Sequence, residues 1–124
     1  MNMKRLPQIS ESEWEVMKTL WDESPLSSLE IAKRLKLHPQ TTRTFISRLV
    51  QKKAIRFLKK GRAYLYEPSI EESDCKTMMS QKFLQRVFGG SLQPMLTHLV
   101  EQDALSEEEM DALRKILRRK GNQS

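Results

Sequence analysis

The feature that most constrains the fold is the stretch PQTTRTFISRL at 39–49, which has helical periodicity and two unlike faces. Proline is tolerated at the first position of a helix and disrupts later ones, so Pro39 predicts the helix start. At about 100° per residue, one face collects Thr42, Phe45, Ile46 and Leu49. The other face collects Gln40, Arg43, Thr44, Ser47, Arg48 and Gln51. Amide, hydroxyl and guanidinium groups recognise base edges and phosphates, so this outer face predicts a nucleic-acid contact.

Two earlier helices give this segment its context. Ser10 precedes Glu13 by three residues, and Ser27 precedes Glu30 by three. That spacing is typical of a capping box, in which a side chain satisfies free backbone donors at a helix start. We therefore expect helices over about 11–23 and 28–36. The second helix, a turn at Leu37-His38 and the helix from Pro39 form a helix-turn-helix pattern.

The period changes from helical to alternating over AIRFLKKGRAYLYEP at 54–68. This pattern predicts two strands joined by a turn at Gly61, with Lys59, Lys60 and Arg62 at its tip. A helix-turn-helix followed by such a hairpin is a winged helix. We assign residues 1–68 to this domain and expect the hairpin to lie along a phosphate backbone while the third helix enters the major groove.

The charge is distributed unevenly. The chain has a net charge of +6; residues 1–68 hold 14 Lys/Arg and 7 Asp/Glu, whereas 69–124 hold 8 and 9. Between 31 and 66 there are eleven basic residues and no acidic one. A solvated surface normally mixes charges of both signs, so this stretch predicts a polyanionic partner, double-stranded DNA in the first place.

The usual marks of catalysis and of metal binding are missing. One cysteine excludes a disulfide framework and a thiolate-cluster metal site, and His38 and His98 stand alone. There is no glycine-rich phosphate loop and no apolar run of roughly 18 residues. We therefore expect no cofactor, no metal ion, no enzymatic activity and no membrane insertion, and the cytoplasm is the simplest location.

The pattern of residues 69–124 predicts three amphipathic helices. Three helices are too few to bury all of their apolar faces against one another. Packing against a second copy would cover them, so we assign 69–124 to a helical dimerisation domain. The expected dimerisation residues are Met79, Phe83, Val87, Leu96, Leu99, Val100, Met110, Leu113 and Leu117. The predicted fold is thus mainly α with a small β-hairpin: a winged helix-turn-helix followed by a three-helix dimerisation region. A symmetric dimer would place two reading helices about one turn of DNA apart.

Four stretches resemble the penicillinase and methicillin-resistance repressor family (the BlaI/MecI type). They are ISESEWEVMKTLW at 9–21, TTRTFISRLVQKKAI at 41–55, GRAYLYEP at 61–68 and LVEQDALSEEEMDALRKIL at 99–117. The resemblance implies a homodimeric bacterial repressor of palindromic operators, linked to antibiotic resistance and controlled by a membrane-bound sensor protease system whose signal leads to its cleavage. By position it implies that Gln40, Thr41 and Arg43 contact the bases of the operator. It also implies a scissile bond at about His98-Leu99. The antibiotic-responsive relatives have an Asn-Phe pair at that position, which this chain lacks.

Two alternatives stay open beside this reading. A winged-helix regulator induced by a small ligand would keep the DNA role and replace proteolysis with a pocket near the dimer helices. A winged helix that binds an acidic protein would use the same basic surface for a different partner.

Overall fold

The computed structural model describes residues 6–122, which form two compact units that divide between Met79 and Ser80. The elements are α1 (Glu11–Asp22), α2 (Ser28–Leu35), α3 (Pro39–Gln51), β1 (Ile55–Lys60), β2 (Ala63–Pro68), α4 (Glu72–Phe88), α5 (Leu92–Glu101) and α6 (Glu107–Gly121). The mainly helical fold with one small hairpin is therefore confirmed.

The helix starts of the first unit follow from local hydrogen bonding. Ser10 and Ser27 form complete capping boxes with Glu13 and Glu30 at the starts of α1 and α2, as their spacing predicts. Pro39 occupies the first turn of α3, where its missing N–H costs nothing. The residue before it acts as the cap: Nδ1 of His38 accepts the Gln40 N–H at 3.0 Å, a contact that the sequence pattern did not predict.

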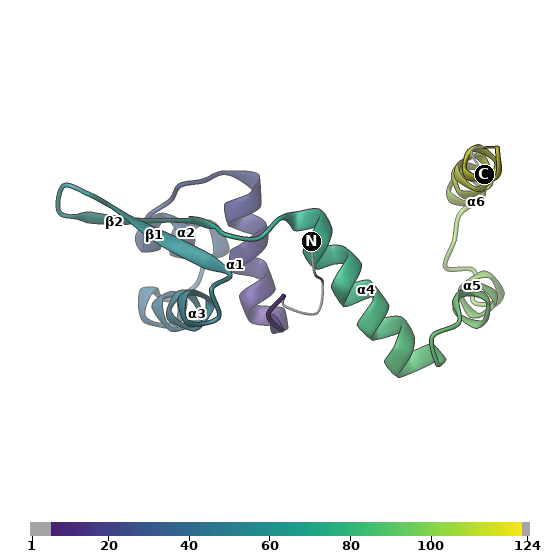
Figure 1. Ribbon diagram of the computed structural model, residues 1–124, viewed down its shortest axis with the longest axis horizontal. Helices are drawn as coiled ribbons and strands as arrows, with labels where there is room; N and C mark the ends of the chain where they lie inside the picture. Colours follow the sequence, from purple (N-terminus) through teal and green to yellow (C-terminus); the bar gives the residue numbers. More distant parts are fainter. Residues whose placement is uncertain (1–5, 123–124) are drawn as a thin grey trace. The chain divides into compact units, whose positions relative to one another are not determined.

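The hairpin projects as an arm from the helices α1 to α3 (Figure 1). Its antiparallel register runs from Ile55 opposite Pro68 to Lys60 opposite Ala63. Gly61 takes the left-handed backbone conformation at φ +65° that the tight turn requires. At the base, Leu26 adds a bridge: its N–H donates to the Tyr66 carbonyl at 3.1 Å, and the Tyr66 N–H donates back at 2.7 Å. The α1–α2 connection therefore extends the hairpin by one short pairing, which completes the winged-helix arrangement.

The core of the first unit lies between α1, α2, α3 and the hairpin base. Its buried hydrophobic members include Val16, Met17, Leu20, Ile31, Ile46, Leu49 and Ile55. Trp14 and Trp21 are partly buried against it, and their rings pack edge to face at 5.2 Å.

The first unit extends beyond the compositional boundary predicted at 68/69. The Trp21 indole N–H donates to the Ile70 carbonyl at 3.0 Å, and Cys75 and Met78 on α4 are buried. These contacts fasten the start of α4 to the winged helix. The helix α4 itself begins at Glu72.

The second unit holds the rest of α4, then α5 and α6. Gly89 and Gly90 follow α4 in left-handed conformations, which end the helix. No residue of α5 or α6 is buried. Large apolar side chains of this unit that remain exposed are Phe83, Val87, Leu92, Val100, Ile116 and Leu117. The second unit thus has apolar surface that one chain leaves uncovered.

Candidate nucleic-acid interface

The outer face of α3 is built as its periodicity predicts. Thr42, Ile46 and Leu49 are buried against the core, which fixes the rotation of the helix about its axis. The residues that turn outward are exposed: Gln40, Thr41, Arg43, Thr44, Ser47 and Arg48. Five of them, all except Thr41, line a shallow hollow of about 390 Å³. An Nη of Arg43 donates a hydrogen bond to the Gln40 side-chain oxygen at 3.0 Å. The two side chains therefore lie side by side on the outer face of α3.

The hairpin tip supplies a second group of cations. Lys59, Lys60 and Arg62 are all exposed there. The Lys59 ammonium lies 5.9 Å from the centre of the Tyr64 ring, and Phe57 meets the same ring edge to face at 5.5 Å. Both aromatic side chains are about half exposed. This arrangement holds Lys59 beside an amphipathic surface while its charge stays in water.

A groove of about 420 Å³ joins α3 to the hairpin. Its lining residues are Arg43, Ile46, Ser47, Val50, Gln51, Phe57, Tyr64 and Tyr66. Reading the alternation of the strands identified the cations of the tip but did not identify Phe57 and Tyr64 as part of the candidate site. The strand alternation could have identified these two aromatic residues, because the register of a hairpin determines which side chains of its two strands lie near one another on the same face. α3 and the hairpin therefore form one continuous surface.

Three of the eleven cations of residues 31–66 form ion pairs within the first unit. Arg34 bonds Glu23, Lys52 lies 2.5 Å from Glu13, and Arg56 lies 2.6 Å from Glu67. These ion pairs link elements of the first unit to one another. Within residues 6–122, by contrast, the site cations have no carboxylate partner: Arg43, Arg48, Lys59, Lys60 and Arg62. Their charge is available to an external anion.

The end of α3 is held by a buried carboxylate. Glu13 is 2% exposed, and its Oε1 accepts from the Lys52 ammonium and from the Ser10 N–H. Burial alone would raise the pKa of Glu13, but the hydrogen bonds from Lys52 and Ser10 and the Lys52 charge outweigh it and lower the pKa below 4.5. Glu13 is therefore ionised at neutral pH and fixes Lys52, the residue after α3.

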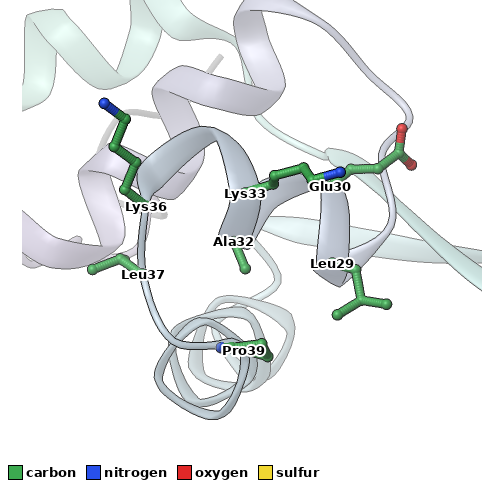
Figure 2. A pocket seen from close by; sticks show the side chains of 7 residues that line it. All are labelled: Leu29, Glu30, Ala32, Lys33, Lys36, Leu37 and Pro39. Atoms are coloured by element: carbon green, nitrogen blue, oxygen red, sulfur yellow. The ribbon is translucent and has the colours of Figure 1, made fainter.

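A separate hollow of about 470 Å³ lies between α2 and the start of α3. Figure 2 shows Leu29 and Ala32 directed towards Pro39, whereas Lys36 points away from them. Its floor is apolar, with Glu30 and Lys33 at the rim. The described residues contain no cluster of His, Cys, Asp or Glu that could hold a metal ion. In the same part of the chain, no helix is long and apolar enough to span a bilayer.

The predicted dimerisation residues lie on α4, α5 and α6, and none of them is buried. Phe83, Val87, Val100 and Leu117 are exposed, and Met79, Leu96, Leu99, Met110 and Leu113 are intermediate. The predicted cleavage position, His98-Leu99, falls inside α5. The Leu99 carbonyl accepts the Ala104 N–H at 2.9 Å, and the His98 ring lies 6.4 Å from that of Phe88.

The chain is similar in sequence to known proteins. The family described as "Penicillinase repressor" matches residues 9–119. The penicillinase repressor of Bacillus licheniformis is 40% identical over 119 residues, covering 93% of each chain. The methicillin resistance regulatory protein MecI of Mammaliicoccus sciuri is 34% identical over 117 residues, covering 91% of this chain and 95% of MecI. The solution structure of monomeric B. licheniformis BlaI with the blaP half-operator is similar with a TM-score of 0.49 and 41% identity, over 56% of this chain and 89% of that one.

Proposed function

The chain belongs to the penicillinase repressor family of DNA-binding transcriptional repressors, which are regulators rather than enzymes, and we propose that it binds a palindromic operator as a homodimer through α3 and the hairpin. In this proposal Gln40, Thr41 and Arg43 contact base edges from the major groove. Thr44, Ser47 and Arg48 flank them on α3. The hairpin cations Lys59, Lys60 and Arg62 bind phosphates, and the protein acts in the cytoplasm.

One observation carries the proposal: within residues 6–122, every cation of the α3 face and the hairpin tip lacks a carboxylate partner. Arg43 and Arg48 come from α3, and Lys60 from the hairpin, and no acidic residue occurs between 31 and 66. A guanidinium that is not neutralised by a neighbour can donate two hydrogen bonds to the O6 and N7 acceptors of guanine. Lysines on the adjacent hairpin can neutralise phosphates without regard to sequence.

The homodimer is supported by the uncovered apolar side chains of the second unit. Leu117 is 58% exposed and Val87 is 51% exposed, and α5 and α6 bury no residue within the chain. A second copy would remove this surface from water at about 25 cal/mol per Å². It would also bring two copies of α3 to one duplex, which matches a palindromic site.

Induction by proteolysis through a membrane sensor system is the mode that the family resemblance supports. The His98-Leu99 bond lies in α5, whose backbone carbonyls are hydrogen-bonded, so cleavage there requires that this part of the helix unfold first.

Selection of bound sequences from random duplex DNA, repeated at two salt concentrations, tests the proposal. We expect a palindromic consensus whose half-sites are about one helical turn apart. Affinity should fall with log salt at a slope of about 0.9 for each phosphate neutralised. Recovery of no consensus, together with capture of an acidic protein by the α3 face, would instead favour the protein-binding alternative.

A further inference from the structure

The groove between α3 and the hairpin has one aromatic wall. In the register of the hairpin, Phe57 stands opposite Tyr66 and Lys59 stands opposite Tyr64. Directly opposed residues and alternate residues share a face, so these four side chains lie on the same face of the hairpin. Phe57, Tyr64 and Tyr66 line the groove together with residues of α3. The hairpin therefore turns its aromatic face towards α3.

This aromatic wall is exposed although it is largely apolar. Phe57 is 54% exposed and Tyr64 is 48% exposed, and their rings meet at 5.5 Å with an interplanar angle of 78°. The opposite face of the same strands carries the ion pair between Arg56 and Glu67. Aromatic side chains are enriched at binding surfaces, because each one buries a large apolar area. The wall thus indicates a contact with an apolar group.

The other wall of the groove is polar, and the groove carries no negative charge. The helix α3 contributes Arg43, Ser47 and Gln51, and none of the lining residues is acidic. The Lys59 ammonium lies 5.9 Å from the centre of the Tyr64 ring, on the same face of the hairpin. A partner that matches this groove is therefore anionic at some of its atoms and apolar at others.

We propose that the groove holds the backbone of one DNA strand, and that Phe57 and Tyr64 pack against its deoxyriboses. This inference rests on the proposed function, since it names a contact within the same complex. With α3 in the major groove, the strand that borders that groove passes between α3 and the hairpin. Its phosphates meet the cations, and the sugars are the apolar part of the backbone that remains to face the aromatic wall.

The sugar contact enables the protein to distinguish DNA from RNA. Deoxyribose has only hydrogen at C2′, whereas ribose has a hydroxyl group there. A 2′-hydroxyl pressed against the two ring faces would lose its water and gain no good hydrogen-bond partner, which is unfavourable. Phe57 and Tyr64 are therefore specificity-determining residues for the sugar of the backbone rather than for the base sequence.

A nucleobase matches the aromatic wall less well than a sugar does. Bases stack parallel to an aromatic ring, and they become available only when they leave the paired duplex. The rings of Phe57 and Tyr64 are nearly perpendicular to each other, so they form no parallel-sided slot for a base. The sugars of an intact duplex, by contrast, are accessible along the whole backbone.

A ribonucleotide scan of the bound duplex tests the inference. The full-length chain is titrated, by fluorescence anisotropy, with the selected consensus duplex and with copies that carry one ribonucleotide at successive positions. We expect the wild-type affinity to fall about tenfold at the contacted sugars of each half-site and to change little elsewhere. In Phe57→Ala and Tyr64→Ala this penalty should largely disappear. Each penalty compares two affinities of one variant, so a loss of folded protein does not alter it.

Two control variants separate the ring contact from other causes. Leu58→Ala removes a side chain that is 40% exposed on the opposite face of the hairpin, and it should keep the wild-type penalty. Tyr64→Phe keeps the ring without the hydroxyl group and should also keep the penalty. An effect of the ribonucleotide on the shape of the duplex would persist in every variant, so the part that disappears reports the contact.

The remaining outcomes of the scan overturn the inference. If the consensus duplex binds and no ribonucleotide penalty depends on Phe57 or Tyr64, the sugar contact is wrong and operator binding stands. If Tyr64→Phe loses the penalty as Tyr64→Ala does, the hydroxyl group makes the contact instead of the ring. If Phe57→Ala weakens binding to single-stranded DNA and keeps the penalty, the ring stacks on bases. If no duplex is bound at all, the proposed function fails as well.

Hydroxyl-radical cleavage of the bound duplex gives a second readout at the sugars themselves. The sugars whose replacement by ribose weakens wild-type binding should be protected from cleavage by the wild-type protein. Phe57→Ala should restore their cleavage at a protein concentration that saturates the duplex. Equal protection by the two proteins would contradict the contact.

Discussion

The Lys52 ammonium lies 2.5 Å from the carboxylate of Glu13, which joins the end of α3 to the start of α1. The same ammonium donates to the Gln8 carbonyl at 2.9 Å, and the same carboxylate oxygen accepts the Ser10 N–H at 3.1 Å. Residues 39 apart in sequence thus share one hydrogen-bonded network. It fixes the end of the helix that we propose reads DNA.

Lys52→Met should destabilise the protein by about 1–3 kcal/mol, because it leaves a buried carboxylate without its cationic donor. Glu13 is 2% exposed, so water replaces the lost ammonium poorly. Urea unfolding measures the change, with Lys18→Met on the exposed side of α1 as the matched control. Equal midpoints for the two variants would show that the ion pair contributes nothing to stability.

The contribution of this pair should disappear in acid. The hydrogen bonds from Lys52 and Ser10 hold the pKa of Glu13 in the folded protein below its ordinary value, so the stabilisation is present above the unfolded-state pKa and is lost as pH falls through the folded-state pKa. The difference in unfolding free energy between wild type and Glu13→Gln should therefore shrink as pH falls from 7 towards the acid range. Exposed Glu15→Gln serves as the control, and a difference that stays constant with pH would contradict the assignment.

Arg43→Ala should relax operator preference at one base step by about 1–3 kcal/mol, because it removes a bidentate donor from the α3 face. The measurement is competition between the selected operator and its single-base variants. Ser47→Ala, on the same face but without a charge, is a milder comparison. An unchanged base preference in Arg43→Ala would mean that α3 is not the reading helix.

Lys60→Ala should weaken binding to all sequences alike and reduce the slope of log affinity against log salt by about 1. Lys60 lies at the hairpin tip without a carboxylate partner in the described part of the chain, so the variant removes a phosphate contact and no internal ion pair. Mobility shifts at several salt concentrations measure the slope. Loss confined to the specific operator would assign Lys60 to base recognition instead.

Gly61→Ala should destabilise the hairpin by about 1–2 kcal/mol, because alanine is strained in the left-handed conformation. A Cβ at Gly61 would meet nothing within 4 Å, so the cost comes from the backbone alone. Gly61→Asn should cost less, since asparagine tolerates this conformation. Thermal unfolding compares the two, and equal losses would point to crowding rather than to backbone strain.

Local patterns in the sequence predicted the local structure well. The capping boxes of Ser10 and Ser27, the start of α3 at Pro39 and the turn at Gly61 each follow from the preferences of a few adjacent residues. The buried and exposed faces of α3 follow from its period.

Contacts between distant residues could not be read in this way. The capping box identified Glu13 as a helix cap, but its second role depends on Lys52 lying nearby in the folded chain. The bridge between Leu26 and Tyr66 forms through backbone groups that every sequence carries. His38 as a cap was missed because histidine is seldom preferred there. The base and phosphate contacts are still predictions, since they depend on a duplex.

The bridge between Leu26 and Tyr66 ties the base of the hairpin to the α1–α2 connection, whereas the turn at Gly61 lies at the far end of the arm. Residues added or removed around Gly61 would change the reach of the arm without disturbing the packing beneath it. A change in hairpin length would therefore alter the phosphate contacts that a repressor of this architecture makes beside its operator. The base contacts of α3 would remain the same.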